Sequence, residues 1–328
     1  MRPSAPEIDV SICVVNWNDP IRLRSCLQSL KDIQPLNDVN YEVIVIDNGS
    51  NDNSKELVIN EFPMVRLIAL PQNIPLAAAW NKGLLMGRGR YFFILNNDIV
   101  LLRDCVSRMV RFLAENSTAG VVVARLLDPD GSTQKRYYPC KLPTLGSLFA
   151  LISWLDRLWP DNPWGFKAGG GGWNPDKIFQ MEQVPASAMM VKREVLDSVG
   201  LLDEGFRFYY EDVDFCNRCG KAGWTLWYLP DAQVVHYGGA SVEIMAYSDV
   251  TLFRFRSLLR YGDKYFTRSQ YFVLRLLVAG ILILRLPVVF AIELLPSAKV
   301  KGRWKGAHRA HLRMFWESLV APPRITDR

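Results

Sequence analysis

Four short hydrophobic runs in the first third of the chain alternate with segments of helical periodicity. The runs cover residues 10–15, 41–46, 65–70 and 91–95. The helical segments between them follow Pro20 to about residue 30, follow Ser50 to about residue 60, and span about 76–86. Short strands that are apolar throughout and alternate with helices are typical of a parallel sheet with both faces covered. Crossovers between such strands are right-handed. The pattern therefore predicts an α/β fold with a mostly parallel, Rossmann-like sheet.

Polar side chains follow these runs where each predicted strand ends. They are Asn16, Asp47, Asn73 and the triplet Asn96-Asn97-Asp98. In open parallel sheets the ligand site lies outside the carboxyl ends of the strands, so these residues predict one cleft. The chain contains neither Gly-x-Gly-x-x-Gly nor Gly-x-x-x-x-Gly-Lys-Ser/Thr. A nucleotide bound in this cleft is therefore held without the dinucleotide fingerprint or the phosphate loop.

A second candidate site follows in the second half of the chain. An aromatic run, 206–210, leads into Glu211-Asp212-Val213-Asp214, and helical spacing continues through Cys219. The acids therefore start a helix, where they either perform chemistry or only stabilise the helix N-terminus. A further apolar run, 232–235, ends at His236, which lies just before two glycines. Taken alone, the pattern leaves both interpretations open.

Composition and charge restrict the class of protein. With 328 residues, of which 49% are hydrophobic, the chain fits one large domain with an appendage. The net charge is +6, and the segment 299–313 carries six basic residues and no acid, which suggests an anionic surface as partner. Six cysteines without paired metal-ligand spacing favour a reducing cytosol. Cys216 and Cys219 form a CxxC pair inside a predicted helix without a second ligand pair, and residues 1–9 show no secretory signal.

Five motifs occur in a fixed order along the chain. They are Val14-Val15-Asn16-Trp17-Asn18, Val45-Ile46-Asp47-Asn48-Gly49-Ser50, Leu95-Asn96-Asn97-Asp98, Phe208-Tyr209-Tyr210-Glu211-Asp212-Val213-Asp214-Phe215-Cys216 and Val234-Val235-His236-Tyr237-Gly238-Gly239. In this order they resemble the family 2 glycosyltransferases of the GT-A fold, and among them the rhamnosyltransferase-like enzymes that build bacterial surface polysaccharides. The resemblance implies a GT-A nucleotide-sugar-binding domain over residues 10–246. An N-terminal tail (1–9) precedes it, and a helical, basic, membrane-associated region (247–328) follows it.

The resemblance implies a set of donor-binding residues. Asp47 is expected to hydrogen-bond the base or ribose of a nucleotide sugar, with Asn16 and Trp17 flanking the base. The remaining donor-binding residues that it implies are Asn73, Asn96 and Asn97. Asn96 departs from the family pattern, because it replaces the first acid of an Asp-x-Asp motif and so removes one anionic metal ligand.

The resemblance also implies a metal and a catalytic base. Asp98 stands at the last acid of the Asp-x-Asp motif, which holds Mg²⁺ or Mn²⁺ on the diphosphate. His236 matches a position that completes the metal shell, which favours Mn²⁺. Asp212 matches the base that deprotonates the acceptor hydroxyl in a single, inverting displacement. Glu211 is expected to assist as a second catalytic residue, since it and Asp214 raise the pKa of Asp212 through like-charge repulsion.

The segment 271–295 is mostly apolar, but Arg275 and Arg285 interrupt it and Pro287 predicts a break or kink. Its longest uncharged run, 276–284, has nine residues. Because a membrane span needs about 20 apolar residues, we expect a helix that lies in the interface with its arginines reaching the headgroups. The expected interfacial anchors are Trp304, Phe315 and Trp316. The alternative is a helical hairpin that packs on the catalytic domain or forms a homodimer, and no motif indicates nucleic-acid binding.

Three functions follow from these residues. The leading hypothesis is a transferase at the inner face of the cell membrane that moves rhamnose from dTDP-rhamnose to a lipid-linked saccharide. The second is a polyprenyl-phosphate sugar synthase, whose phosphate acceptor needs no general base. The third is a non-catalytic nucleotide-sugar-binding membrane subunit, motivated by Asn96. Four glycines at 169–172 suggest either a mobile acceptor loop or a poorly ordered surface loop.

Overall fold

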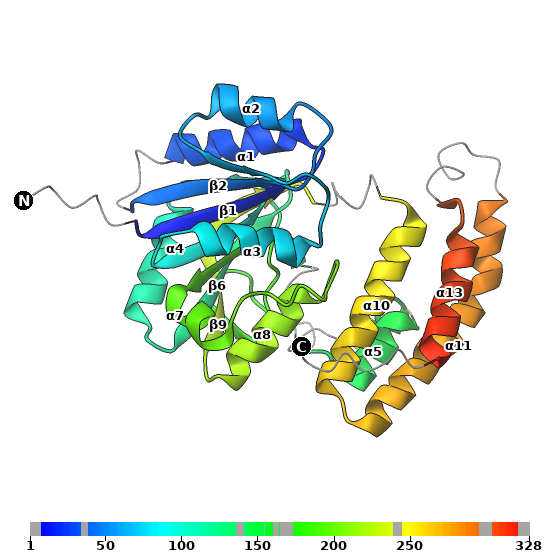
Figure 1. Ribbon diagram of the computed structural model, residues 1–328. Helices are drawn as coiled ribbons and strands as arrows, with labels where there is room; N and C mark the ends of the chain where they lie inside the picture. Colours follow the sequence, from blue (N-terminus) through cyan, green and yellow to red (C-terminus); the bar gives the residue numbers. More distant parts are fainter. Residues whose placement is uncertain are drawn as a thin grey trace, which may run out of the picture. The chain divides into compact units, whose positions relative to one another are not determined.

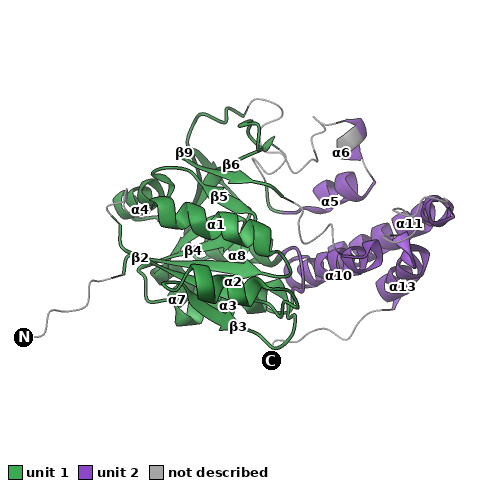
Figure 2. Ribbon diagram, turned by 90° about the horizontal axis from the view of Figure 1, so that it is seen from above, with its two compact units in different colours: residues 1–142, 167–205, 211–238 green, residues 143–166, 206–210, 239–328 purple. Residues whose placement is uncertain are grey.

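The computed structural model describes residues 8–33, 39–135, 141–153, 155–159, 164, 173–238, 245–294 and 304–320. The glycine-rich loop at 169–172 and the basic residues between 299 and 303 lie outside these ranges. The chain forms two compact units, which are coloured separately in Figure 2. Unit 1 combines residues 1–142, 167–205 and 211–238, and unit 2 combines residues 143–166, 206–210 and 239–328.

The first half of unit 1 has the predicted alternation of strands and helices. Its elements are β1 (Val10–Asn16), α1 (Pro20–Ile33), β2 (Tyr41–Asp47), α2 (Ser54–Glu61), β3 (Arg66–Ala69), α3 (Leu76–Met86) and β4 (Tyr91–Asn96). β1 pairs in parallel with β2 and β4, and β2 pairs in parallel with β3. Figure 1 shows α1 and α2 on one face of these strands and α3 on the other. The predicted α/β fold with a parallel sheet at its centre is confirmed.

The second half of unit 1 extends this sheet with strands of both directions. Its elements are β5 (Ile99–Leu101), α4 (Cys105–Glu115), β6 (Ala119–Leu127), β7 (Phe179–Met181), β8 (Ala188–Lys192), α7 (Arg193–Val199), α8 (Glu211–Lys221) and β9 (Thr225–His236). The strand order is β3-β2-β1-β4-β8-β6-β9-β5, with β7 beside β9. β8 is antiparallel to β4 and β6, whereas β6 and β9 are parallel. The apolar run expected at 232–235 forms the end of the longer strand β9, whose register against β6 shifts between Leu229 and Gln233.

Close packing of α3 on the sheet fixes the position of the strand ends. The side chains of Ile12, Val14 and Ile46 are fully buried, and burying one such side chain contributes about 1.5–3 kcal/mol. Gly83 of α3 allows the helix to approach, because a Cβ there would lie 2.8 Å from Ile46 Cδ1 and 3.0 Å from Cys13 Sγ. The strands that carry the candidate site are therefore held by a dense core.

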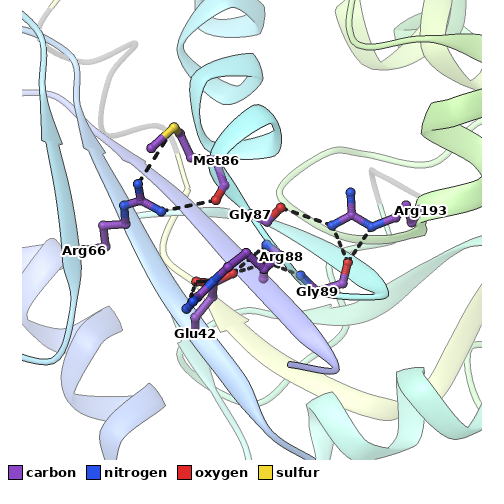
Figure 3. Close-up of polar contacts among 8 residues, drawn as sticks. Glu42, Arg66, Met86, Gly87, Arg88, Gly89 and Arg193 are labelled. Carbon is purple, nitrogen blue, oxygen red and sulfur yellow. Dashed lines mark hydrogen bonds and ion pairs between the residues drawn. The ribbon is translucent and has the colours of Figure 1, made fainter. Parts of the chain in front are cut away.

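A polar network lies at the amino end of the sheet, where β1, β2 and β4 begin (Figure 3). Glu42 accepts hydrogen bonds from the Ser11 hydroxyl (2.8 Å), the Arg88 amide (2.7 Å) and the Arg88 guanidinium (3.0 Å and 3.2 Å). The Ser11 hydroxyl in turn accepts from the Gly89 amide at 2.8 Å. Burial raises the pKa of Glu42, but the hydrogen bonds from Arg88 and Ser11 outweigh it, so that the pKa lies below its ordinary value.

Arginines complete this network around the turn between α3 and β4. Arg193 donates to the carbonyl oxygens of Gly87 (3.1 Å) and Gly89 (2.7 Å and 3.0 Å), and its guanidinium lies 4.6 Å from the centre of the Phe92 ring. Arg66 donates to the Met86 carbonyl oxygen at 3.3 Å (Figure 3). These carbonyl oxygens lie at the end of α3 and in the turn after it. The hydrogen bonds that they accept hold the turn that leads into the central strand β4.

Unit 2 is helical and has a core of its own. Its helices are α5 (Leu145–Ile152), α6 (Leu155–Leu158), α10 (Tyr247–Tyr265), α11 (Arg268–Glu293) and α13 (Ala307–Leu319). Leu148, Leu258, Leu274 and Met314 are buried together in this core. Of the break or kink predicted at Pro287, the break is wrong, because α11 continues through this residue to Glu293.

The two arginines of α11 point into unit 2. Arg275 donates to the carbonyl oxygens of Ser318 (2.8 Å) and Leu319 (2.5 Å), and Arg285 donates to that of Ile152 (2.5 Å). They therefore bind the C-terminal carbonyls of α13 and α5, where a positive charge is favourable. The prediction that these arginines reach toward lipid headgroups is wrong for this conformation.

Two of the three predicted anchors are also engaged within unit 2. Trp304 stacks on Tyr247 with ring centroids 3.9 Å apart, and Phe315 packs against the helical core. Trp316 is 65% exposed. By length and composition, α11 is long and apolar enough to cross a membrane, although such a helix also occurs in the core of water-soluble proteins.

Candidate functional site

The predicted donor-binding residues of β1 and β2 lie together at the carboxyl end of the sheet. Asn16 and Asp47 end these strands side by side, and both side chains are 1% exposed. Asn16 Nδ2 lies 3.4 Å from Asp47 Oδ2, and its Oδ1 accepts from Asn97 Nδ2 at 2.8 Å. Asp47 Oδ1 also accepts from the Ser50 amide at 3.0 Å. The structure thus brings Asn16, Asp47 and Asn97 together, and it adds Ser50, which the sequence reasoning had not selected.

The loop after β3 brings Asn73 to the same edge. Asn73 Nδ2 donates to the Asn48 carbonyl at 3.3 Å, and the Asn48 side chain bonds both the amide and the carbonyl of Ile74 at 3.0 Å. Gly49 makes this approach possible, because it has a positive φ of 76° and a Cβ there would lie 2.4 Å from the carbonyl carbon of Gln72. Asn48, which belongs to a quoted motif but was not selected as a site residue, therefore fixes this loop. Trp17 follows Asn16 and is partly exposed.

Asp98 and His236 face each other across a short antiparallel pairing. Ile99 of β5 lies opposite His236 of β9, and the Tyr237 amide donates to the Asp98 carbonyl at 3.0 Å. Asp98 Oδ1 lies 3.5 Å from His236 Nε2, and both side chains are about 95% buried, with 5% and 4% exposed. Burial raises the pKa of Asp98, although the nearby His236 acts in the opposite direction.

These two side chains fit a divalent cation. Asp98 Oδ1 is buried and has no hydrogen-bond partner among the described residues. Neighbouring ligands at the Mg²⁺ distance in octahedral geometry stand roughly 3 Å apart, close to the observed 3.5 Å between Oδ1 and Nε2. In the described part of the chain no group of three or more His, Cys, Asp and Glu side chains is placed to hold a metal. Among the described residues the site therefore offers two ligands, and Asn96 ends β4 two positions before Asp98.

The predicted catalytic acids begin α8. Glu211 is 5% exposed, and its Oε2 has no hydrogen-bond partner within the described ranges. Burial, followed by the charge of Asp212, raises the pKa of Glu211 to about 8. Asp212 is less deeply buried, and its Oδ1 accepts from the Val213 amide at 2.8 Å. Burial is the main cause that raises the pKa of Asp212.

Asp214 has a different role from the one expected. It is fully buried and accepts a hydrogen bond from Arg218 Nε at 2.9 Å. Arg218 also donates to the carbonyl oxygens of Val199 (2.5 Å) and Leu201 (2.8 Å). Asp214 is therefore neutralised by a partner that ties α8 to the segment after α7, and the predicted like-charge effect of Asp214 on Asp212 is wrong.

The segment before β8 connects the two groups of acids. The Asn96 amide donates to the Ser187 carbonyl at 2.9 Å, and the Ala186 amide hydrogen-bonds the Asp212 carboxylate. Ala186 and Ser187 are consecutive, so the residues after β4 and the start of α8 lie close to each other within unit 1.

Backbone strain precedes the acids. Tyr209 and Tyr210 have φ values of 66° and 68°, and they come directly before Glu211. A bulky residue in this left-handed region costs on the order of 1–3 kcal/mol, and such residues cluster at functional sites. No sequence signal revealed this conformation, since neither residue is Gly, Asn or Asp.

Two solved glycosyltransferase structures are similar to this chain. The crystal structure of GalNAc-T7 with UDP, GalNAc and Mn²⁺ matches with a TM-score of 0.54 at 14% identity over 79% of this chain and 51% of that one. The mannosyltransferase PcManGT from Pyrobaculum calidifontis, in complex with GDP-Man and Mn²⁺, matches with a TM-score of 0.51 at 16% identity over 95% and 87% of the two chains. The fold is therefore the GT-A fold.

The sequence is similar to known glycosyltransferases. Residues 11–169 match the family model described as glycosyl transferase family 2. An N-acetylglucosaminyl-diphospho-decaprenol L-rhamnosyltransferase of Mycobacterium tuberculosis is 28% identical over 214 residues, which are 60% of this chain and 66% of the relative. The dTDP-rhamnosyl transferase RfbF of Shigella flexneri is 26% identical over 70% of each chain. The chain thus spans just under two thirds of the mycobacterial relative.

Proposed function

We propose that this chain transfers a sugar, rhamnose from dTDP-rhamnose, to a hydroxyl group of a lipid-linked saccharide. The observation that carries this proposal is that Asn96, two residues before Asp98, and Asp212 bond two consecutive residues, Ser187 and Ala186, in one unit. The rhamnosyltransferase relatives support the donor and the class of acceptor. In this proposal residues 10–246 are the transferase domain and residues 247–328 are its membrane-associated extension.

Asp212 acts as the general base in this reaction. The acceptor oxygen forms a bond to the anomeric carbon while the bond from that carbon to the diphosphate breaks, which inverts the configuration. The acceptor proton passes to Asp212, and the electron pair of the broken bond leaves with the nucleoside diphosphate. A carboxylate with a raised pKa is a stronger base than an exposed one, so its burial assists this step.

The remaining residues bind and orient the donor. Asp98 and His236 would hold Mg²⁺ or Mn²⁺, which neutralises charge on the departing diphosphate when it is bound. Asp47 accepts hydrogen bonds from the base or ribose at the end of β2. The other donor-binding residues of the proposal are Asn16, Trp17, Asn73, Asn96 and Asn97.

Replacement of the base is the direct test. Asp212→Asn keeps the shape of the side chain and should lower the rate of transfer by about 10²–10⁴-fold, because it removes the base. Binding of dTDP with Mn²⁺, measured by calorimetry, should be unchanged. Asp231→Asn serves as the matched control, since Asp231 is 75% exposed. Full activity of Asp212→Asn would exclude the base role and favour a phosphate acceptor, and nucleotide binding without transfer by the wild type would favour a non-catalytic subunit.

The exposed face of α11 supports attachment to the inner face of the cell membrane. Leu276, Leu284 and Val288 on this helix are 48%, 75% and 53% exposed, while Arg275 and Arg285 are turned inward. A helix of 26 residues is about 39 Å long, so its apolar side offers an extended surface for lipid. The proposal is a helix lying in the interface, near the lipid-linked acceptor.

Vesicle flotation tests this attachment. The double variant Leu276→Glu, Leu284→Glu should lose binding to vesicles that contain anionic lipid, while Ile59→Glu, at an exposed apolar position of α2, should not. If flotation is unchanged but sedimentation shows that the variant loses a dimer, the face serves a second copy of the chain instead.

A further inference from the structure

Gln134 is a buried residue whose polar groups the proposed reaction does not use. After β6 the chain turns at Asp128–Ser132: the Asp128 amide donates to the Ser132 carbonyl at 2.7 Å, and Gly131 has a φ of 85°. The chain then runs back along the end of β6, where the Gln134 amide donates to the Leu126 carbonyl at 2.9 Å. The side chain of Gln134 is 2% exposed. This turn therefore delivers an amide side chain to the end of β9.

The contacts of Gln134 determine the orientation of its amide group. Nε2 donates to the His236 carbonyl at 2.7 Å and to Asp128 Oδ1 at 2.8 Å. A carbonyl and a carboxylate only accept, so the NH₂ group must face them. Gln134 Oε1 then lies 2.8 Å from His236 Nδ1. Because Oε1 only accepts, Nδ1 must carry a proton.

This proton decides what the other ring nitrogen can do. In neutral histidine one nitrogen is protonated and the other carries a lone pair, so a proton on Nδ1 leaves the lone pair on Nε2. Nε2 is the nitrogen that lies 3.5 Å from Asp98 Oδ1. The ring is therefore prepared to act as a metal ligand on the side of Asp98.

We propose that Gln134, oriented by Asp128, is a positioning residue that holds His236 in the Nδ1-protonated tautomer and so makes Nε2 a ligand for the divalent cation. The inference rests on the proposed function, because it assigns the support of that metal site. Partners that orient a ligating histidine typically contribute 10–100-fold to metal affinity. With Asn96 in place of an acid, the protein's ligands reduce to Asp98 and His236, so the orientation of His236 carries a larger share of the affinity.

The first test reads the tautomer directly. The chain has three histidines, so ¹⁵N-histidine labelling of the full-length protein gives a spectrum that His236→Gln assigns. Without metal, His236 should show protonated Nδ1 and unprotonated Nε2. Gln134→Leu should convert this signal to a tautomer mixture. Asp128→Ala, at a partly exposed turn, removes one of the two acceptors that orient the Gln134 amide. It should shift the signal in the same direction by a smaller amount, and it tests the inference if Gln134→Leu fails to fold.

The second test measures metal affinity. Mn²⁺ titration in the presence of dTDP, followed by electron paramagnetic resonance of free Mn²⁺, should show about 10–100-fold weaker binding in Gln134→Leu. Gln134→Glu still accepts a hydrogen bond from His236 Nδ1, so its Mn²⁺ affinity should fall by less than that of Gln134→Leu. Gln233→Leu removes an amide side chain elsewhere on β9 and should bind Mn²⁺ as tightly as the wild type does.

The outcomes separate this inference from the function on which it rests. If the wild type binds Mn²⁺ and Gln134→Leu and Asp128→Ala bind equally well with an unchanged tautomer, the inference is overturned and the transferase proposal stands. If the wild type binds no Mn²⁺ with any of dTDP, UDP or GDP, the metal site itself is overturned, and the role of Gln134 with it.

Discussion

The two ends of the sheet in unit 1 differ in whether particular carboxyl oxygens have hydrogen-bond partners. At the amino end, the oxygens of Glu42 accept from Ser11 and Arg88, and Arg193 binds the carbonyls at the end of α3. At the carboxyl end, Asp98 Oδ1 and Glu211 Oε2 are buried without a hydrogen-bond partner among the described residues. Both ends belong to the same strands, so the difference does not come from the fold.

This difference distinguishes side chains that stabilise the folded protein from side chains that take part in the proposed reaction. A buried polar atom without a partner costs about 1–3 kcal/mol, and such a cost persists in a folded protein when something else depends on it. The amino end has no such cost at Glu42. We therefore expect substitutions at the amino end to change the free energy of unfolding and substitutions at the carboxyl end to change activity.

Asp98→Asn should give the largest effect and sharpen this comparison. Transfer should fall by at least about 100-fold, because the variant loses the anionic metal ligand. Unfolding in urea should show equal or higher stability, by up to about 1 kcal/mol, because the amide can donate to His236 Nε2. A variant that is active but less stable would show that Asp98 serves the fold.

Arg193→Ala tests the opposite end. It leaves the carbonyls of Gly87 and Gly89 without their charged donor, and the free energy of unfolding should fall by about 2–3 kcal/mol. Activity per folded molecule at a temperature well below the transition should stay within about twofold of the wild type. Arg90→Ala, which removes a neighbouring exposed arginine, is the control. A selective loss of kcat in folded protein would contradict the separation of the two ends.

Glu211→Gln tests the second carboxyl group with an oxygen that lacks a hydrogen-bond partner, through the pH dependence of the free energy of unfolding. The pKa of Glu211 in the folded protein, about 8, lies above the unfolded value of 4.5. Between these two pH values the unfolded state therefore binds fewer protons than the folded state does. The stability that protonated Glu211 contributes is therefore complete below about pH 4.5 and is lost as pH rises through about 8. The variant should remove this decrease, which is at most about 1.4 kcal/mol per pH unit. Parallel stability curves of wild type and variant from pH 5 to 8 would contradict the raised pKa.

The sequence predicted the strands of the site better than their directions. Apolar runs located β1, β2 and β4, and turn residues marked Asn16, Asp47 and Asp98 at their ends. The antiparallel direction of β8 could not be predicted, because a strand buried on both faces has the same apolar pattern in either direction.

Partners distant in sequence limited what could be predicted of the site. Asp214 was expected to repel Asp212, but Arg218 neutralises it from four residues further along the same helix. This pair is local, and its i,i+4 spacing could have been recognised in the sequence. Gln134 is 102 residues from His236, so no local pattern in the sequence linked the two side chains. The arginines of α11 were assigned to lipid for a similar reason, since their carbonyl partners lie on other helices. Side chains whose role depends on tertiary contacts carry no local signal.

Ser11→Ala gives the smallest effect and the most specific one. Its hydroxyl donates to Glu42 and accepts from the Gly89 amide, so its loss leaves one donor unpaired and weakens one acceptor. The free energy of unfolding should fall by about 1 kcal/mol, and the pKa of Glu42 should rise toward its ordinary value, because one of the bonds that lowers it is gone. Ser25→Ala on exposed α1, whose hydroxyl bonds only its own helix, should change stability by less than about 0.5 kcal/mol. Equal effects of the two serines would show that the polar network at the amino end contributes no more than an ordinary surface hydroxyl, and the contrast between the two ends of the sheet would then rest on Arg193 alone.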